Sequence, residues 1–276
     1  MTRSFIKLKT KYKIFIAKII LKFLNIFINN LKFIKKVGEI KWSFDLNEGI
    51  DLNLYIFKKF EFEVIKTSMK LNIRKNSSII DIGANTGIQT LQFANVFKTN
   101  KVYAIEPTDF AFSKLKFNIN LNKKLKSRIN IYQAFITNKK RKPKMVYSSW
   151  NLKSKKFHKN HYGTFKSTNS SKVFSLDNFI SKKKIKNISL IKIDVDGNEL
   201  YVFKSAKNTL KKKIPIIMEL APYLYKENNY SLDDLVNLLK SFKYSFFEMN
   251  SLAKIDDIYD YSLNIPHGSS KNIIIK

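Results

Sequence analysis

A glycine-containing turn follows a short run of β-forming residues and could bring the backbone close to a ligand. Residues 81–87 read Asp-Ile-Gly-Ala-Asn-Thr-Gly and lead into a predicted helix. Glycine at a strand-to-helix turn lets the chain turn sharply, with no Cβ in the way of a bound molecule. The dinucleotide fingerprint has the spacing G-x-G-x-x-G, whereas Asn85 stands where its middle glycine would be. This difference favours a cofactor that lacks a pyrophosphate, and a turn without a ligand is the alternative.

A single carboxylate, Glu106, stands 19 residues beyond Gly87, at the end of the next predicted strand. A carboxylate in this position can accept hydrogen bonds from both hydroxyls of a ribose. The turn and the carboxylate together predict an adenosine-type cofactor. They do not by themselves distinguish NAD from S-adenosylmethionine.

Further carboxylates follow two later strands. Residues 191–199 read Ile-Lys-Ile-Asp-Val-Asp-Gly-Asn-Glu, and Glu219 ends the strand after them. Open α/β sheets place their chemistry at such strand ends. A carboxylate there can remove the proton of a hydroxyl, bind substrate hydroxyls, or join others around a divalent cation. For Glu199, the first acid of a predicted helix, a structural role at the helix dipole is the alternative.

The elements that must position these residues follow an α/β order. From about residue 60, short apolar runs alternate with segments of helical period, and we assign 59–276 to one domain. Strands separated by helices imply βαβ units and a mainly parallel sheet with helices on both faces. The predicted strands are 78–82, 101–105, 128–132, 188–193, 214–218, 244–247 and 272–275. The predicted helices are 60–71, 88–97, 110–120, 199–210 and 232–242.

Residues 134–176 interrupt this pattern with a polar, lysine-rich insertion. Alternation in 144–147 and in 172–176 predicts two antiparallel additions, with 151–171 as a surface loop between them. The histidines of the loop, which we expect to be solvated and not to bind a ligand, are His158 and His161.

Residues 1–58 are predicted to form a basic, amphipathic helical extension. Residues 1–36 carry ten basic groups and no acid, and Lys18 and Lys22 interrupt their apolar stretch. A membrane-spanning helix needs roughly 20 mostly apolar residues, so these lysines argue against one. Two interpretations stay open. Residues 11–36 lie on an anionic membrane surface, or the apolar face packs on the domain or on a second subunit.

The chain of 276 residues has no cysteine and a net charge of +31. The lack of cysteine excludes disulfides, zinc–thiolate sites and cysteine nucleophiles. A strongly basic chain suggests a nucleic-acid partner, but only four of the 52 basic residues are arginine, the side chain best suited to reading bases and phosphates. We therefore do not expect a nucleic-acid partner. We expect a cytoplasmic protein, peripheral on the cytoplasmic membrane face if the extension binds lipid.

Taken together, these motifs resemble the FkbM family of methyltransferases. The similarity covers about residues 60–249 and the terminal 272–275. In that family the run at 192–199 reads K-I-D-V-E-G-x-E, and here Asp196 replaces its glutamate. Residues 175–177, Ser-Leu-Asp, resemble the family's T-L-D step before the same strand. The resemblance implies a class I methyltransferase fold of Rossmann-like type, with seven strands, one of them antiparallel, and S-adenosyl-L-methionine at the carboxyl ends of the first two.

The resemblance also implies roles for individual residues. The first turn would surround the methionine end of the cofactor, Glu106 would hold the ribose, and the residues after the third strand would contact the adenine. The predicted cofactor residues are Asp81, Gly83, Ala84, Asn85, Gly87, Glu106, Pro107, Gln133 and Ala134. The predicted catalytic residues are Asp194, Glu199 and Glu219, with Asp194 as the first choice for the base, and no metal site is predicted.

The function that follows is an O-methyltransferase acting on a hydroxyl of a sugar, a glycan or a related small acceptor, including a lipid-linked one. Two alternatives stand beside it. One is an RNA methyltransferase that uses the positive charge to bind its substrate. The other is a membrane-associated scaffold that keeps the fold without turnover.

Overall fold

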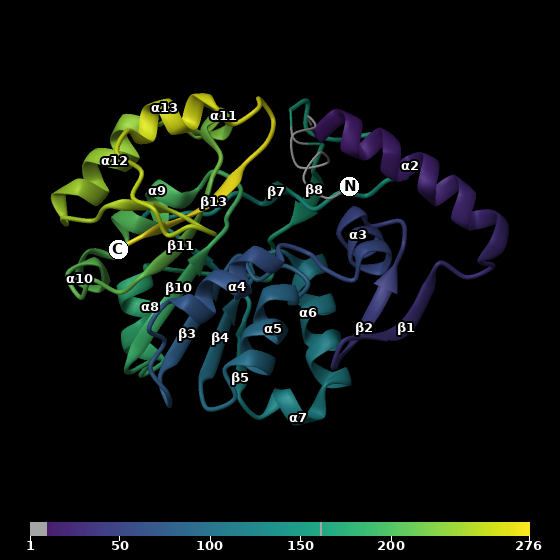
Figure 1. Ribbon diagram of the computed structural model, residues 1–276, viewed down its shortest axis with the longest axis horizontal. Coiled ribbons are helices and arrows are strands. Elements are labelled where there is room, and N and C mark those ends of the chain that lie inside the picture. The colour runs from purple at the N-terminus through teal and green to yellow at the C-terminus, as the bar shows by residue number, and fades with distance from the viewer. Residues whose placement is uncertain (1–9, 161) are drawn as a thin grey trace.

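The computed structural model describes residues 10–160 and 162–276, and its centre is a seven-stranded sheet (Figure 1). The strands are β3 (Ser78–Ile82), β4 (Lys101–Ile105), β5 (Ile129–Tyr132), β10 (Ile188–Ile193), β11 (Ile216–Leu220), β12 (Phe246–Glu248) and β13 (Lys271–Ile275). Their order is β12-β13-β11-β10-β3-β4-β5. Only β13 is antiparallel to its neighbours in this sheet. The predicted class I methyltransferase fold is thereby confirmed.

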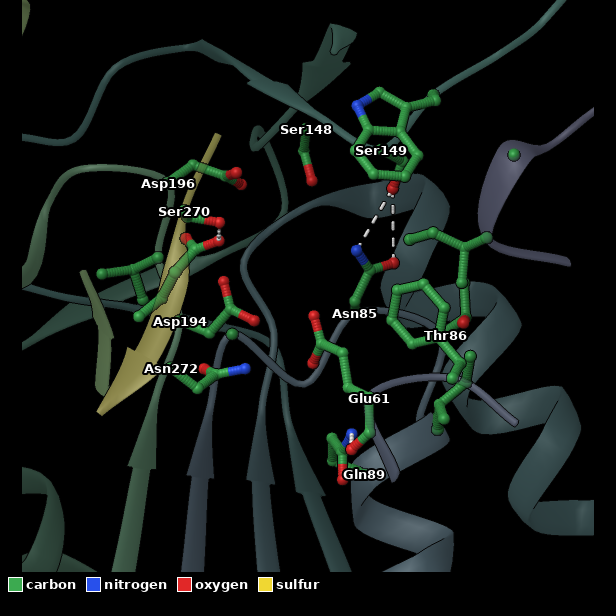
Figure 2. A pocket seen from close by; sticks show the side chains of 18 of the residues that line it. Glu61, Asn85, Thr86, Gln89, Ser148, Ser149, Asp194, Asp196, Ser270 and Asn272 are labelled. Atoms are coloured by element: carbon green, nitrogen blue, oxygen red, sulfur yellow. Dashed lines mark hydrogen bonds between the residues drawn. The ribbon is translucent and has the colours of Figure 1, made fainter. Parts of the chain in front are cut away.

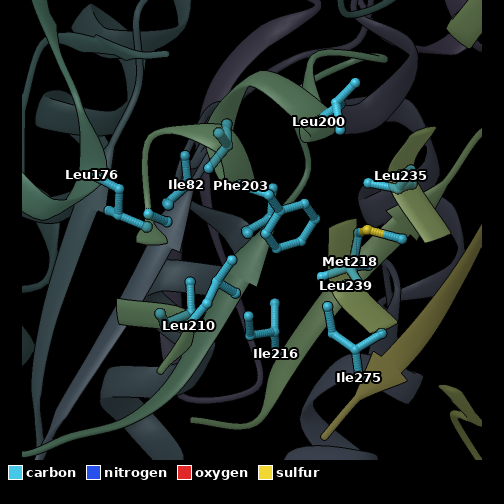
Figure 3. Packing of buried hydrophobic residues seen from close by; sticks show 14 of the residues in the cluster. Ile82, Leu176, Leu200, Phe203, Leu210, Ile216, Met218, Leu235, Leu239 and Ile275 are labelled. Carbon is cyan, nitrogen blue, oxygen red and sulfur yellow. The ribbon is translucent and has the colours of Figure 1, made fainter. Parts of the chain in front are cut away.

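Helices cover both faces of the sheet and close two apolar cores. The helices of the domain are α4 (Phe62–Lys70), α5 (Ile88–Val96), α6 (Asp109–Leu121), α7 (Lys123–Lys126), α8 (Leu176–Lys182), α9 (Glu199–Lys204), α10 (Lys207–Leu210), α11 (Pro222–Tyr225), η1 (Lys226–Asn228), α12 (Leu232–Ser241) and α13 (Ile258–Leu263). Side chains alternate across a strand, so Ile80 joins one core and Ile79 the other. Figure 3 shows the first core, where Phe203 and Leu235 pack near Met218.

The predicted single helix over 199–210 is two short helices. Ser205 stands at the break, where its hydroxyl accepts the Leu176 N–H at 3.0 Å and its carbonyl accepts the Asp177 N–H at 3.2 Å. The Asp177 carboxylate in turn accepts the N–H groups of Asn208 and Thr209 at 2.8 and 2.9 Å, at the start of α10. The helical period of the sequence runs through residue 205, so it did not predict a break there. The contacts of α8 with Ser205 and with the start of α10 interrupt the helix.

The described residues of the insertion, 134–160 and 162–176, contain four short strands. They are β6 (Ala134–Ile136), β7 (Met145–Ser148), β8 (Thr164–Ser167) and β9 (Lys172–Phe174). β7 pairs antiparallel with β8, as predicted for 144–147, but β8 lies inside the range predicted to be a loop. β9 pairs in parallel with β6, so the antiparallel prediction for 172–176 was wrong. Alternation in a sequence indicates a strand and does not identify its partner.

The N-terminal region combines helices with a β-hairpin. Its elements are α2 (Thr10–Phe27), β1 (Lys32–Val37), β2 (Ile40–Asp45) and α3 (Gly49–Phe57). The helical prediction was wrong for residues 32–45, because β1 and β2 pair antiparallel around Gly38, whose φ is 59°. Trp42 and Phe44 of β2 are buried in the domain core. Residues 1–9, part of the predicted extension, lie outside the described range, and within that range no helix is long and apolar enough to cross a membrane.

Candidate active site

The carboxyl ends of the parallel strands open into a cavity of about 1590 Å³. Figure 2 shows Asp194 and Asp196, from the loop after β10, and Glu61, from the residue before α4, at this space. The predicted site residues in its wall are Asp81, Gly83, Ala84, Asn85, Glu106, Pro107, Ala134, Asp194 and Glu219. Open α/β sheets bind their ligands at this edge. The predicted residues thus come from the ends of five strands, β3, β4, β5, β10 and β11, and meet in one cavity.

Gly83 brings the turn after β3 against the end of β10. Its φ is 82°, and a Cβ added there would lie 1.7 Å from the carbonyl oxygen of Asp194. The N–H groups of Gly83 and Ala84 both donate to the Ile105 carbonyl, at 2.9 and 3.0 Å. The turn is therefore held by β4 on one side and by β10 on the other, and no other residue type fits at position 83.

Glu106 keeps one acceptor position for a ligand. Its Oε2 accepts the Asn85 N–H at 2.9 Å, and its Oε1 accepts the N–H and the hydroxyl of Thr108 at 2.9 and 2.6 Å. A carboxylate has about four lone-pair sites, so these three bonds leave one of them for a ribose hydroxyl. Burial raises the pKa of Glu106 above its ordinary value.

Asn85 connects the turn to the insertion. Its φ is 48°, a left-handed conformation that asparagine tolerates better than most residues. Its side-chain Nδ2 lies 3.2 Å from the Ser149 hydroxyl, which lies 3.3 Å from Asn85 Oδ1 (Figure 2). The asparagine that replaces the middle glycine of a dinucleotide fingerprint thus fixes a wall of the cavity.

Lys192, which was not among the predicted site residues, supplies a buried cation beside the carboxylates. Its side chain is 2% exposed, and its Nζ donates to Asp194 Oδ2 at 2.8 Å. Burial alone would lower the pKa of Lys192, but Asp194 and the nearby Asp81 more than offset burial and raise it above the ordinary value. The signal in the sequence was a lysine inside an otherwise apolar strand, where an unpaired charge is costly.

Glu61 was also missed, and no sequence signal pointed to it. It precedes α4 with a φ of 45°, and this backbone conformation turns its side chain into the cavity (Figure 2). Burial, with Asp194 as the next cause, raises the pKa of Glu61 to about 7. Across the cavity, Glu219 accepts a hydrogen bond from the Ser270 hydroxyl. Burial and Asp194 also raise the pKa of Glu219 well above its ordinary value.

Three predicted residues, Gly87, Gln133 and Glu199, are not among those that line the cavity. Gln133 donates to Asp109 Oδ1 at 2.7 Å. Glu199 is fully buried, and its Oε1 accepts the N–H groups of Val195 and Gly197 at 3.4 and 3.2 Å. This carboxylate stabilises the turn that carries Asp194 and Asp196, so its contacts are those of a positioning residue.

The Glu199 carboxyl predicts a pH dependence of stability. Burial raises its pKa from 4.5 to about 7, so folding takes up a proton between these values. The contribution of the Glu199 carboxyl to the free energy of unfolding is complete below about pH 4.5. It is lost as the pH rises through about 7, and the total loss is on the order of 3 kcal/mol. Urea unfolding between pH 4.5 and 8 should show a much smaller loss for Glu199→Gln than for the wild type. The exposed Glu39→Gln is the control, and equal slopes for both variants would contradict the assignment.

Within residues 10–160 and 162–276, no group of three or more histidine, cysteine or acidic side chains could hold a metal ion.

His158 lies in the cavity wall, where its Nε2 is 2.7 Å from Glu227 Oε2 and its Nδ1 accepts the Asn160 N–H at 3.2 Å. It is buried, contrary to the expectation that it is solvated. His161 falls outside the described residues. The His267 ring lies against that of Tyr223, with the ring centroids 5.9 Å apart and the planes tilted by 56°.

The cavity fits a cationic, phosphate-free cofactor. Its lining includes the carboxylates Asp81, Asp194 and Glu61, with Lys192 as the cation beside them, and this excess of acid favours a sulfonium and an ammonium and disfavours a pyrophosphate. Asp81 Oδ2 accepts the Thr90 hydroxyl at 2.6 Å, whereas its buried Oδ1 has no hydrogen-bond partner among the described residues. Buried acceptors are nearly always paired, so this oxygen fits a donor group of the cofactor.

The chain was also compared with known proteins. Solved structures that resemble the chain include the precorrin-6y C5,15-methyltransferase of Geobacter metallireducens GS-15 (13% identity, 79% of this chain and 86% of that chain, TM-score 0.43). Others are TYW2 of M. jannaschii in complex with AdoMet (13%, 89% and 84%, 0.42) and a putative rRNA-methylase of Clostridium thermocellum (10%, 79% and 96%, 0.45). A search of curated proteins gives no match. The family model of the methyltransferase FkbM domain matches residues 81–246, well over half of the chain. The chain therefore belongs to the FkbM family of S-adenosylmethionine-dependent methyltransferases.

Proposed function

We propose that the protein transfers a methyl group to a hydroxyl of a sugar, a glycan or a related small acceptor. The supporting observation is the wall beside Asp194, in which Asp196, Glu219, Ser270 and Asn272 all offer hydrogen-bonding groups (Figure 2). The buried Oδ1 of Asn272 has no partner among the described residues and requires a donor. A polyhydroxylated acceptor supplies several donors at once, which suits carboxylate and amide oxygens.

Asp194 is the base of this proposal. The bound cofactor supplies a methyl group on a positive sulfur, which an oxygen nucleophile can attack in line. Asp194 Oδ2 is held by Lys192, and its other oxygen is left to accept the proton of the acceptor hydroxyl. Fixing the base in this way contributes through orientation as well as through proton transfer.

An RNA acceptor is a weaker candidate. The phosphates of RNA require cationic contacts, while the wall around Asp194 carries Asp196, Glu219 and Glu61. Asp194 also neutralises Lys192, the buried cation nearest to this wall. Lys13, Lys59 and Lys271 also line the cavity, but the side chains around Asp194 are mainly acidic.

The test uses radiolabelled S-adenosylmethionine with glycan, lipid and RNA fractions of the host cell. We expect label in a glycan-containing fraction, and mass spectrometry of the product to show one added methyl group on oxygen. Label confined to RNA, lost steeply as salt is raised, would instead support the nucleic-acid alternative. The absence of label from every fraction would contradict turnover on all three acceptor classes.

Glu106→Gln is expected to weaken S-adenosylmethionine binding by about 10- to 100-fold. The replacement removes the charge that strengthens a hydrogen bond to the ribose, worth about 1.5–3 kcal/mol. Calorimetric titration measures the affinity, and thermal unfolding checks that the contacts of the side chain to Asn85 and Thr108 still hold the turn. An unchanged dissociation constant would show that Glu106 does not bind the cofactor.

A further inference from the structure

The outer face of α2 exposes a continuous row of large apolar side chains. Phe15, Phe23 and Ile26 are 63%, 60% and 71% exposed, although each could bury most of its surface in a packed interface. The full row is Tyr12, Phe15, Ile19, Phe23, Ile26 and Phe27. Isolated exposed apolar residues are ordinary, whereas a contiguous patch marks an interaction surface.

Lysines run alongside this row. At 100° per residue, the first five side chains of the row, those up to Ile26, lie within about 80° of one another around the helix axis. Lys11, Lys18 and Lys22 lie within about 40° of one another, next to one edge of this apolar row. All three lysines are exposed. The outer half of the helix therefore has an apolar stripe and a basic stripe side by side.

The inner face of α2 packs against the domain, so its outer face points away from the domain. Leu21 is buried, and Ile14, Ala17 and Leu24 pack against the domain core. At the start of the helix, the Thr10 hydroxyl donates to the Gly268 carbonyl at 2.5 Å. Rotation about the helix axis would break these contacts, so α2 cannot bury its outer row against its own domain.

We propose that the outer face of α2 docks on an anionic lipid bilayer, with its apolar stripe among the acyl chains and its lysine stripe against the headgroups. A helix with a large apolar face and flanking lysines is suited to lie in this interface. Juxtaposed lysines attract anionic lipid at the surface. A second copy of the chain would instead bring together two molecules of net charge +31 and two lysine stripes.

Docking would place the cavity beside the bilayer. Lys13, Ile14, Ala17 and Ile20 of α2 form part of the cavity wall. One helix therefore separates the bilayer from the cavity that contains Asp194. This arrangement suits a hydroxyl acceptor carried on a lipid, a conclusion that rests on the proposed function, whereas the docking itself does not.

The test is co-sedimentation of the full chain with vesicles of phosphatidylglycerol and phosphatidylcholine in equal parts, and with pure phosphatidylcholine vesicles. The triple variant Phe15→Ser, Ile19→Ser, Phe23→Ser is expected to lower partitioning by about a hundredfold. The triple variant Lys11→Gln, Lys18→Gln, Lys22→Gln is expected to lower it by a similar factor on anionic vesicles only.

Matched controls change equally exposed residues elsewhere. Lys204→Gln, Lys207→Gln, Lys211→Gln removes the same charge around α9 and α10, at the opposite end of the molecule (Figure 1). Met69→Ser, Phe117→Ser, Leu263→Ser removes apolar groups that are 54%, 49% and 82% exposed. Both controls should bind vesicles as the wild type does.

Three results would overturn the proposal. The wild type could fail to bind anionic vesicles, or a control variant could lose as much vesicle binding as the variant it matches. The third is that the protein does not bind vesicles and forms a dimer that the Phe15, Ile19 and Phe23 variant dissociates. The last would assign the face to a second copy of the chain. S-adenosylmethionine affinity, measured on every variant without vesicles, should be unchanged. If the wild type did not bind S-adenosylmethionine, the cofactor site would be contradicted, and the result on vesicle docking would still stand.

Discussion

Asp194→Asn is expected to lower kcat for methyl transfer by about 10²- to 10⁴-fold, the usual contribution of a positioned base. Asparagine has nearly the same shape and cannot accept the proton of a hydroxyl. Glu106 and the turn after β3 can hold the cofactor without this charge, but the Asp194 carboxylate also favours its positive sulfonium, so the affinity for S-adenosylmethionine should fall by a much smaller factor than kcat.

The measurement is single-turnover transfer of labelled methyl to the acceptor fraction, with calorimetry for the cofactor. The exposed Asp256→Asn changes the same functional group outside the cavity and should be fully active. A kcat within about threefold of the wild type would show that another group is the base.

Gly83→Ala is expected to destabilise the fold by about 3 to 5 kcal/mol, or to prevent recovery of folded protein. Two effects add at this position. The positive φ of 82° strains any residue with a Cβ, and the added atom would lie 1.7 Å from the Asp194 carbonyl oxygen. Because that oxygen belongs to the backbone, the strand end itself must move to relieve the contact.

Gly38→Ala separates these two effects. Gly38 also has a positive φ, of 59°, but a Cβ added there meets no heavy atom within 4 Å. Only the backbone strain remains, so the expected loss is about 1 kcal/mol. Urea unfolding of both variants measures the difference. Similar losses in the two variants would mean that β10 does not constrain the turn in the way described.

The strands of the central sheet were predictable because buried parallel strands are short, continuous apolar runs. β3, β4 and β10 have the predicted bounds residue for residue. Their carboxyl ends could also be located, since a glycine or an acid stops each run. From this followed the meeting of Asp81, Glu106 and Asp194 in one cavity, because parallel strands end at the same edge.

The pairing of the peripheral strands was not predictable in the same way. β6 and β9 lie at the two ends of the insertion, and nothing local indicates that they pair in parallel. The hairpin of β1 and β2 was not predicted, because its sequence has the same lysine-rich, apolar composition as the helix before it. Its turn glycine, Gly38, was the available signal, together with the alternation of Ile40, Trp42 and Phe44.

By itself, the sequence determined the fold class, the cofactor turn and the acids at the strand ends, because these depend on short-range patterns of residue type. Tertiary structure alone decided which of those acids face the cavity. It turned Asp194 and Glu219 toward the cavity and Glu199 into the turn, and it brought in Lys192 and Glu61. Such choices depend on packing between elements distant in the chain. The same packing buries the inner face of α2 and leaves its outer face exposed.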